Sequence, residues 1–330
     1  MLCILFATNA FAQNYDFVYN AYGNVKLYCK ITKQATSTKS SGRGEVTIVG
    51  GTGPSGSEVY IDLVSNNGYG YKPTAISSQA FNGATWIGKL YLQGYEKSVG
   101  DYAFRGCTGL TYVSINQAST LGIGEFRGCT GLTSVSIPQS ITTIPDECFY
   151  ECSNLKSLQI GSDVQTIGSC AFYGCSSLTS LTIPNSVTSI GEQAFYGCSG
   201  LTSLTIGNSV KSIGNWAFYR CSKLTSIEIP NSVTSIGSYA FKGCSGLETI
   251  KVNWSQPLSV PNGAFENVDK SLCKLYVPGG TKSLYASADV WEEFLNIVEE
   301  GSSAIPEDVN NDGKVNATDA MLIYNYILSH

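Results

Sequence analysis

Oxygen-bearing side chains recur at calcium-loop spacing near the C-terminus, in the segment DVNNDGKVNATD of residues 308–319. Positions 1, 3, 5, 9 and 12 of this pattern carry carboxylates or amides, and Gly313 at position 6 permits the sharp turn that such a loop requires. Hard oxygen donors at this spacing wrap one Ca²⁺, whereas an acidic linker is the alternative interpretation. The predicted ligands are Asp308, Asn310, Asp312, the backbone carbonyl of Lys314, Asn316 and Asp319.

The other chemistry-bearing residues do not form a catalytic pattern. His330 is the single histidine, which excludes Ser-His-Asp and Cys-His catalysis and a histidine-based zinc centre. Paired carboxylates could still support hydrolysis. The acidic residues of the central region are scattered, however, and no two share a repeat phase in adjacent units: Asp101, Glu125, Asp146, Glu192 and Glu228. We therefore expect a protein that is not an enzyme.

The cysteines allow three interpretations. Most hold one phase of an internal repeat, which favours a buried column of free thiols that act as small hydrophobic side chains. Cys148 and Cys170 lie outside this column in adjacent units, so a disulfide between them is plausible in an exported protein. With Cys152 and Cys175 they also give a C-x3-C…C-x4-C spacing that superficially resembles a zinc site. The members of the column are Cys107, Cys129, Cys152, Cys175, Cys198, Cys221 and Cys244.

A repeat must position these residues. A complete unit reads LTSLTIPNSVTSIGEQAFYGCSG from Leu178, and Leu178, Leu181 and Ile183 carry the L-x-x-L-x-L signature of a short strand. One unit cannot bury its apolar side chains alone, but stacked units cover one another. The pattern predicts an α/β leucine-rich-repeat solenoid of about nine 23-residue coils with short parallel strands. The nine units are marked, at spacings of 22 to 24 residues, by Phe81, Phe104, Phe126, Phe149, Phe172, Phe195, Phe218, Phe241 and Phe265.

The strand signature places one residue of each coil on the exposed face of the predicted parallel sheet. Solenoids commonly bind through such surfaces, and this face is flat enough for a protein or a glycan. The alternative is that its Ser and Thr side chains are merely solvated strand formers. The candidate ligand-binding row is Tyr91, Ser114, Ser136, Gln159, Thr182, Thr205, Glu228, Lys251 and Tyr276.

The motif SIGxxAFxGCSxLTSLTIP resembles the repeat of BspA-like leucine-rich-repeat proteins, which are secreted or surface proteins of Bacteroidota. The resemblance covers residues 76–277, and the segment from VPNGAF to VWEEF is similar to the usual C-terminal end of the family. It implies adhesion or ligand binding without a shared ligand. Glu125 and Cys148 replace the alanine before the phenylalanine, and the unit at Leu121 to Glu125 is one residue short, so we expect local distortion there.

The calcium segment resembles one half of a type I dockerin. Asp319 stands at position 12 of the loop, and the apolar stretch AMLIYNYIL follows it. The resemblance implies a cohesin-like partner, with Ala317 and Thr318 as recognition positions.

Flanking segments complete the predicted organisation. An apolar run followed by AFA before Gln13 is typical of a signal peptide remnant. Apolar residues between Tyr285 and Ile297 fall at helical spacing and predict a short helix over the last coil. The predicted parts are a signal peptide at 1–12, an N-terminal β cap at 13–75, the repeats at 76–277, a C-terminal cap at 278–300 and a calcium segment at 301–330.

Charge and hydropathy narrow the partners. The net charge of −5 provides no basic surface for nucleic acid. No transmembrane segment is expected, because no run of 18 apolar residues occurs. We expect a secreted or cell-surface, non-catalytic protein that presents its repeat face to an extracellular protein or glycan. The alternative is an accessory or scaffold component that docks to a cohesin-type multiprotein assembly through its calcium segment.

Overall fold

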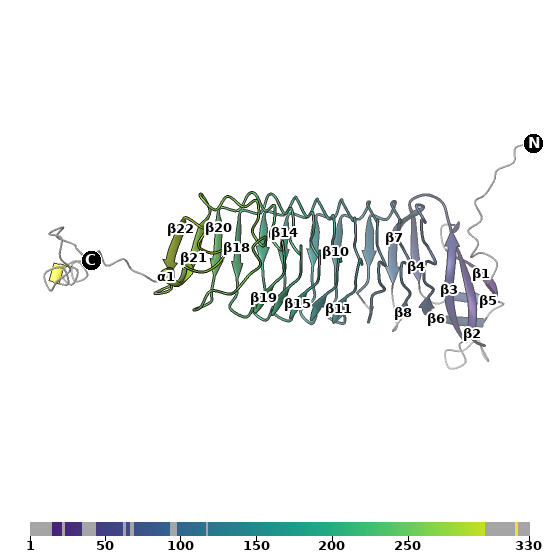
Figure 1. Cartoon of the computed structure of the whole chain (residues 1–330). Helices are drawn as coiled ribbons and strands as arrows, with labels where there is room; N and C mark the ends of the chain where they lie inside the picture. The colour runs from purple at the N-terminus through teal and green to yellow at the C-terminus, as the bar shows by residue number, and fades with distance from the viewer. Residues whose placement is uncertain are drawn as a thin grey trace, which may run out of the picture.

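The computed structural model describes residues 15–21, 24–34, 44–61, 64–66, 69–92, 98–116, 118–300 and 321–322. Up to residue 300 they form an elongated rod, in which short strands lie side by side along the long axis (Figure 1). Strands and turns dominate the described residues, and the helix α1 (Lys282–Tyr285) has four residues. The solenoid predicted from the repeat is confirmed.

A long row of parallel strands forms one side of the rod. The row consists of three hydrogen-bonded sheets that follow one another along the rod. Within each sheet, neighbouring strands pair in parallel, and residues at the same repeat phase lie directly opposite each other. In order along the rod the strands are β4 (Ser57–Ile61), β7 (Ile87–Leu92), β9 (Tyr112–Ser114), β10 (Ser134–Ser136), β12 (Ser157–Gln159), β14 (Ser180–Thr182), β16 (Ser203–Thr205), β18 (Ser226–Ile229), β20 (Thr249–Val252), β21 (Lys274–Pro278) and β22 (Asn296–Glu300). We call the solvent side of this row the sheet face.

A second parallel ladder runs along the rod and is built from strands of two residues. The isoleucine of each strand is buried and its neighbour is more exposed, which is the alternation that a one-sided sheet requires. Its strands are β11 (Thr143–Ile144), β13 (Thr166–Ile167), β15 (Ser189–Ile190), β17 (Ser212–Ile213) and β19 (Ser235–Ile236).

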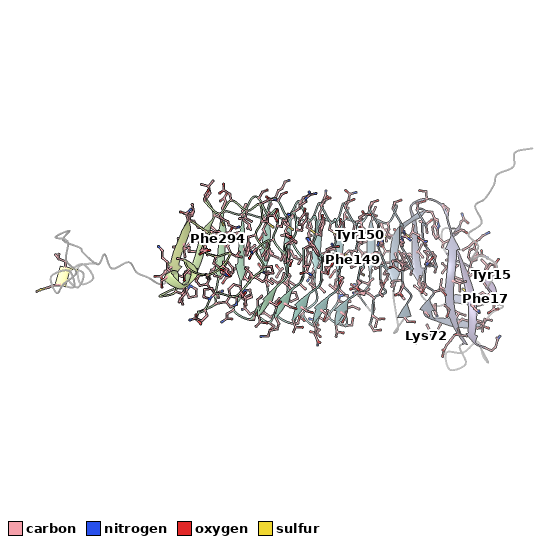
Figure 2. All side chains as sticks on the ribbon, in the orientation of Figure 1. Tyr15, Phe17, Lys72, Phe149, Tyr150 and Phe294 are labelled. Atoms are coloured by element: carbon pink, nitrogen blue, oxygen red, sulfur yellow. The ribbon has the colours of Figure 1, made fainter. Side chains whose placement is uncertain are left out.

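The core is a column of stacked phenylalanine rings. All nine phenylalanines of the repeat expose 2% of their surface or less. Centroids of neighbouring rings lie 5.2 to 5.7 Å apart, from Phe81 to Phe265. Phe149, in the middle of this column, lies within the rod, with Tyr150 beside it in the chain (Figure 2). Each ring covers the next, which is why no coil could keep its core dry alone.

The chain turns around each phenylalanine between two left-handed residues. In the coil of Phe195 these are Gln193, with φ of 54°, and Gly197, with φ of 70°. A left-handed glutamine is strained. Its backbone N–H donates to the carbonyl of Asn215 in the next coil, at 2.8 Å, which helps to hold the conformation.

The N-terminal cap is a sheet with strand order β1-β2-β3-β6-β5, in which β8 also pairs with β6. β4 lies between β3 and β5 in the chain but pairs with β7, the next strand of the solenoid. Coil stacking therefore begins at Ser57, inside the segment predicted to be the cap. The cap strands are β1 (Phe17–Asn20), β2 (Lys26–Lys33), β3 (Gly44–Thr52), β5 (Val64–Asn66), β6 (Tyr69–Ile76) and β8 (Ser98–Val99).

Aromatic residues and one more strand cover the last coil. The helix expected between Tyr285 and Ile297 is present only as α1, and the residues from Asn296 onward form β22. This strand pairs with the edge of β21, whose backbone groups would otherwise remain open. Trp291 packs on Phe265 with ring centroids 5.5 Å apart, and Phe294 follows at 5.9 Å from the same ring.

Glu125 interrupts the regular core, as the short repeat unit predicts. Its side chain is fully buried, and one carboxylate oxygen accepts the N–H of Gly122 at 2.9 Å while the other has no partner. Residues 118–122 form no strand, so the second ladder is broken between β8 and β11. Burial of the carboxylate raises the pKa of Glu125 to about 8.

The raised pKa of Glu125 predicts that stability falls with pH. The folded chain binds the proton of Glu125 more tightly than the unfolded chain, in which the pKa is near 4.5. The folded state therefore keeps its full stability below pH 4.5 and loses stability as the pH rises from there through about 8. Glu125→Ala restores the alanine of the repeat and should flatten this profile. At pH 8 it should raise the free energy of unfolding by on the order of 3 kcal/mol.

Urea-unfolding midpoints measured across this pH range will test the prediction. Glu192→Ala, at a solvent-exposed site, is the matched control and should leave the profile as steep as in the parent protein. An equally steep profile for Glu125→Ala would show that Glu125 is not its source.

Candidate functional site

The nine residues of the predicted ligand-binding row lie in one line on the sheet face. Tyr91 pairs with Ser114, Thr182 with Thr205, and Lys251 with both Glu228 and Tyr276 in register. The row continues one strand further at each end, to Tyr60 on β4 and Val298 on β22. The positions come from alternation within the strand, and the structure places them together as that pattern requires.

A second row on the same face was missed. It comprises the residues two positions earlier in each strand, which point to the same side because side chains alternate with period two. The same alternation, applied once more, would have found it. Its members are Glu58, Lys89, Tyr112, Ser134, Ser157, Ser180, Ser203, Ser226, Thr249, Lys274 and Asn296.

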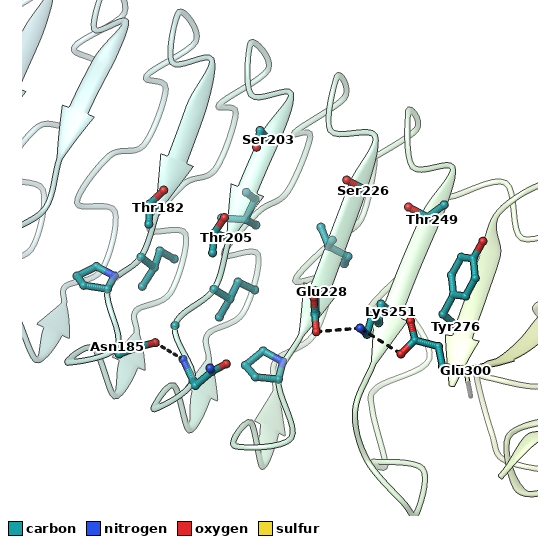
Figure 3. A pocket seen from close by; sticks show the side chains of 18 residues that line it. Thr182, Asn185, Ser203, Thr205, Ser226, Glu228, Thr249, Lys251, Tyr276 and Glu300 are labelled. Atoms are coloured by element: carbon teal, nitrogen blue, oxygen red, sulfur yellow. Dashed lines mark hydrogen bonds and ion pairs between the residues drawn. The ribbon is translucent and has the colours of Figure 1, made fainter. Parts of the chain in front are cut away.

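An open groove of about 870 Å³ lies on the sheet face toward its C-terminal end (Figure 3). It runs over β14, β16, β18 and β20 and reaches Tyr276 and Glu300. Of the predicted row, the groove collects Thr182, Thr205, Glu228, Lys251 and Tyr276. The members on β7 to β12 lie outside it.

The turn after β16 shapes one wall of the groove. Gly207 stands between Pro184 and Pro230, the residues at the same phase in the neighbouring coils. A Cβ atom on Gly207 would lie 2.4 Å from the carbonyl oxygen of Pro184, so the close approach of the two coils requires glycine here. The N–H of Asn208 donates to Oδ1 of Asn185 at 2.7 Å and ties the two turns together.

Charged groups close the C-terminal end of the groove. Lys251 Nζ lies 3.1 Å from a carboxylate oxygen of Glu300 and 3.4 Å from one of Glu228, as the dashed lines of Figure 3 mark. The hydrogen bond to Glu300, with the charge of Glu228, raises the pKa of Lys251. Asn253 Nδ2 also donates to Glu228 at 2.9 Å. These three charged side chains carry a net charge of −1 and stay partly exposed, so they can exchange partners with a ligand.

The groove carries groups suited to polar binding. They are hydroxyls, amides, the carboxylates of Glu228 and Glu300 and one ion-paired lysine, which can donate and accept hydrogen bonds. In the part of the chain that the structure describes, no three His, Cys, Asp or Glu side chains gather as a metal site would need. Glu300 was not anticipated as a groove residue, because its place depends on β22 pairing with β21.

Comparison with known families decides the assignment. Six copies of the BspA type Leucine rich repeat region match residues 74–193 and 165–288, which together span more than half of the chain. The chain belongs to the BspA-type leucine-rich-repeat family. The Dockerin type I domain matches residues 306–330, in agreement with the resemblance seen in the calcium segment. Leucine-rich-repeat and dockerin families are typically non-catalytic binding modules.

Among solved structures, the chain is similar to other leucine-rich-repeat proteins. The chain is similar to the leucine-rich-repeat protein of T. pallidum, at 24% identity and TM-score 0.44, over 65% of this chain and 87% of that one. It is also similar to a leucine-rich cell surface protein of Faecalibacterium prausnitzii, at 20% identity and TM-score 0.42, over 89% of this chain and 97% of that one. A leucine-rich-repeat protein from Bacteroides ovatus matches at 23% identity and TM-score 0.35, over 86% and 100%. No curated protein matches the sequence.

Two further predictions concern the location of the protein and the calcium segment that follows the repeats. Members of this leucine-rich-repeat family are typically secreted or at the cell surface. Among the helices of the described residues, none has the length and apolar character to cross a bilayer. The predicted Ca²⁺ ligands from Asp308 to Asp319, and the recognition positions Ala317 and Thr318, lie outside the described residues.

The thiols of the repeat column are free and buried. Each Sγ donates to the carbonyl of a phenylalanine in the preceding coil, as Cys198 does to Phe172 at 3.4 Å. The disulfide considered between Cys148 and Cys170 is not formed, because both are free thiols. Cys148 is fully buried, whereas Cys170 lies partly exposed on a left-handed turn and contacts Gln193 Oε1 at 3.3 Å. The zinc-like spacing forms no metal site in the described residues.

Thiol labelling should distinguish Cys170 from the column. Burial raises the pKa of Cys198 to about 12 and removes its access to reagent. In the native protein we expect iodoacetamide to modify Cys170 at least about tenfold faster than Cys198, measured by peptide mass mapping. Unfolding in urea should equalise the two rates. Equal labelling before unfolding would mean that the column is open to solvent.

Proposed function

We propose that this leucine-rich-repeat protein is exported, through the leader predicted at residues 1–12, and binds an extracellular protein or glycan in the groove of the sheet face. The convergence of Glu228, Lys251, Glu300 and Tyr276 at one end of an open groove is the main support. Elsewhere in the candidate row the side chains are mostly small hydroxyls. Binding energy concentrates where aromatic and charged side chains meet, and this groove is such a place.

The groove is prepared for a ligand before one arrives. Lys251 is held between two carboxylates, and Glu228 is also bonded to Asn253, so the charged groups lose little freedom on binding. Their partial exposure keeps the desolvation cost of a new polar contact low. The proposal gives these residues no catalytic role.

Removing the charged end of the groove should weaken binding to a ligand identified by screening glycans and extracellular matrix proteins. Glu228→Ala combined with Lys251→Ala should raise the dissociation constant at least about tenfold, measured by titration calorimetry. The ion pair is exposed, so the fold should tolerate the change. Glu192→Ala, which removes an exposed acidic side chain outside the sheet face, is the control and should bind as the parent does. Unchanged affinity of the double variant would refute the groove as the binding site.

A second candidate function rests on the calcium segment. The Dockerin type I match covers the residues that carry the predicted Ca²⁺ ligands, from Asp308 to Asp319. In this reading the solenoid is an accessory part, and the segment docks it to a cohesin-type domain through Ala317 and Thr318. The two functions are compatible, because they use separate parts of the chain.

Chelation separates these functions. If the segment docks, EGTA should release a cohesin-type partner in a pull-down, because it removes the Ca²⁺ ion. Asp308→Ala with Asp312→Ala should abolish capture, because the two substitutions remove carboxylates that would bind Ca²⁺. Asp163→Ala, which removes an acidic side chain from the repeats, is the control and should leave capture intact. Capture that survives both EGTA and the double substitution would rule out calcium-dependent docking.

A further inference from the structure

The N-terminal end of the sheet face carries three tyrosines on adjacent strands, of which the first and third are exposed and the middle one is partly covered. Tyr60 and Tyr91 stack face to face, with ring centroids 4.4 Å apart and planes within 2° of parallel. Tyr112 lies 5.5 Å from Tyr91 at an angle of 48°. Tyr60 and Tyr112 expose 43% and 41% of their surface, although large aromatic side chains are otherwise mostly covered in this rod. We call Tyr60, Tyr91 and Tyr112 the tyrosine platform.

An ion pair fixes the platform and cancels its charge. Lys89 Nζ lies 2.8 Å from one carboxylate oxygen of Glu58, and the hydroxyl of Tyr60 donates to the other at 2.7 Å. In the strand register Tyr112 lies between Lys89 on β7 and Ser134 on β10. Because a serine side chain is too short to cover an aromatic ring, the ring of Tyr112 is open toward the next coils.

From β10 to β16 the sheet face is uncharged and hydroxyl-rich, and we call this stretch, whose last two strands also line the groove, the floor. Ser157 and Gln159 on β12, Thr182 on β14 and Thr205 on β16 are all exposed. The backbone groups of β10 pair with those of β12, and the backbone groups of β14 pair with those of β16. The span from β9 to β18, which contains the floor, measures about 24 Å at the usual strand spacing.

We infer that a neutral, linear, hydroxyl-rich polysaccharide lies along the sheet face, with one part stacked on the tyrosine platform and another in the groove. The inference rests on the proposed function of the groove. Sugar rings offer C–H groups to an aromatic face and hydroxyls to Ser, Thr, Gln and carboxylate side chains, which are the groups displayed here.

Charge and polarity favour this ligand over a protein. The platform is internally neutralised by the Glu58–Lys89 pair, and the floor carries no charge, so a charged polymer gains nothing along most of its length. A protein interface requires an apolar core that excludes water. Along the floor the exposed side chains are short and polar, and the apolar ones point inward, as Leu181 and Leu204 do.

Oligosaccharides of graded length will test the inference. We would titrate the full chain with neutral β-1,4-linked glucose, mannose and xylose series, from disaccharide to octasaccharide, by calorimetry. For at least one series, affinity should rise with length and level off once the oligomer spans both sites. Tyr112→Ser, which copies the serine found at the same phase in the next strand, should lower the affinity for the longest oligomer about tenfold and leave the shortest unchanged.

Two further variants make the result decisive. Tyr112→Phe keeps the ring and should bind as the parent does, whereas Leu272→Ser removes a still more exposed apolar side chain from a turn outside the sheet face and should have no effect. Failure of every series to bind, or equal affinity of Tyr112→Ser and the parent at all lengths, would overturn the inference that a polysaccharide lies along the sheet face. If Glu228→Ala with Lys251→Ala still loses its ligand in that case, the groove function stands alone. If that variant also binds normally, both ideas fail.

Discussion

Contact between identical positions of neighbouring coils is the interaction on which everything else in this molecule depends. Each phenylalanine ring stacks on the ring of the neighbouring coil, and each thiol of the column donates to a carbonyl group of the preceding coil. Each coil is therefore both core and lid for the next, and stability belongs to the stack rather than to any unit. The same stacking aligns side chains outside the core, so the residues at one repeat phase form a continuous row on the surface. The sheet face, with its platform, floor and groove, is a by-product of that alignment.

Much of the fold could be predicted because each repeat phase recurs in the same structural environment in every coil. The phase of Phe195 and Cys198 indicates burial, and the alternation through Leu181 and Thr182 indicates which side chains face solvent. What the repeat could not predict lies where it stops. β4 joins the solenoid although residues 57–61 lack the motif. Turns replace most of the helix expected from Tyr285 to Ile297, and β22 takes its last two residues, where the open edge of β21 offers backbone hydrogen bonds.

The candidate site was predicted in part for a related reason. A row of residues follows directly from the period, and its members at Glu228, Lys251 and Tyr276 do meet in the groove. The hollow itself depends on Gly207 between two prolines and on Glu300 arriving from beyond the repeats, which are differences between coils rather than shared features. The cysteines illustrate the opposite case. Pairing Cys148 with Cys170 follows from adjacency, but one thiol is turned into the core and the other outward, so adjacent coils do not bring them together.

Glu125 gives this rod a mechanical character that its regular repeat would not. A protein anchored at one end and loaded at the other transmits tension through each coil contact in series, and a series fails at its weakest joint. The coil of Glu125 combines a missing strand pair with a carboxylate oxygen that has no hydrogen-bond partner. The contact between coils at Glu125, between the tyrosine platform and the groove, is therefore weakened, and ionisation of the carboxyl group at alkaline pH would weaken it further. The ionisation state of one buried carboxyl group thus makes the strength of this contact between coils depend on pH.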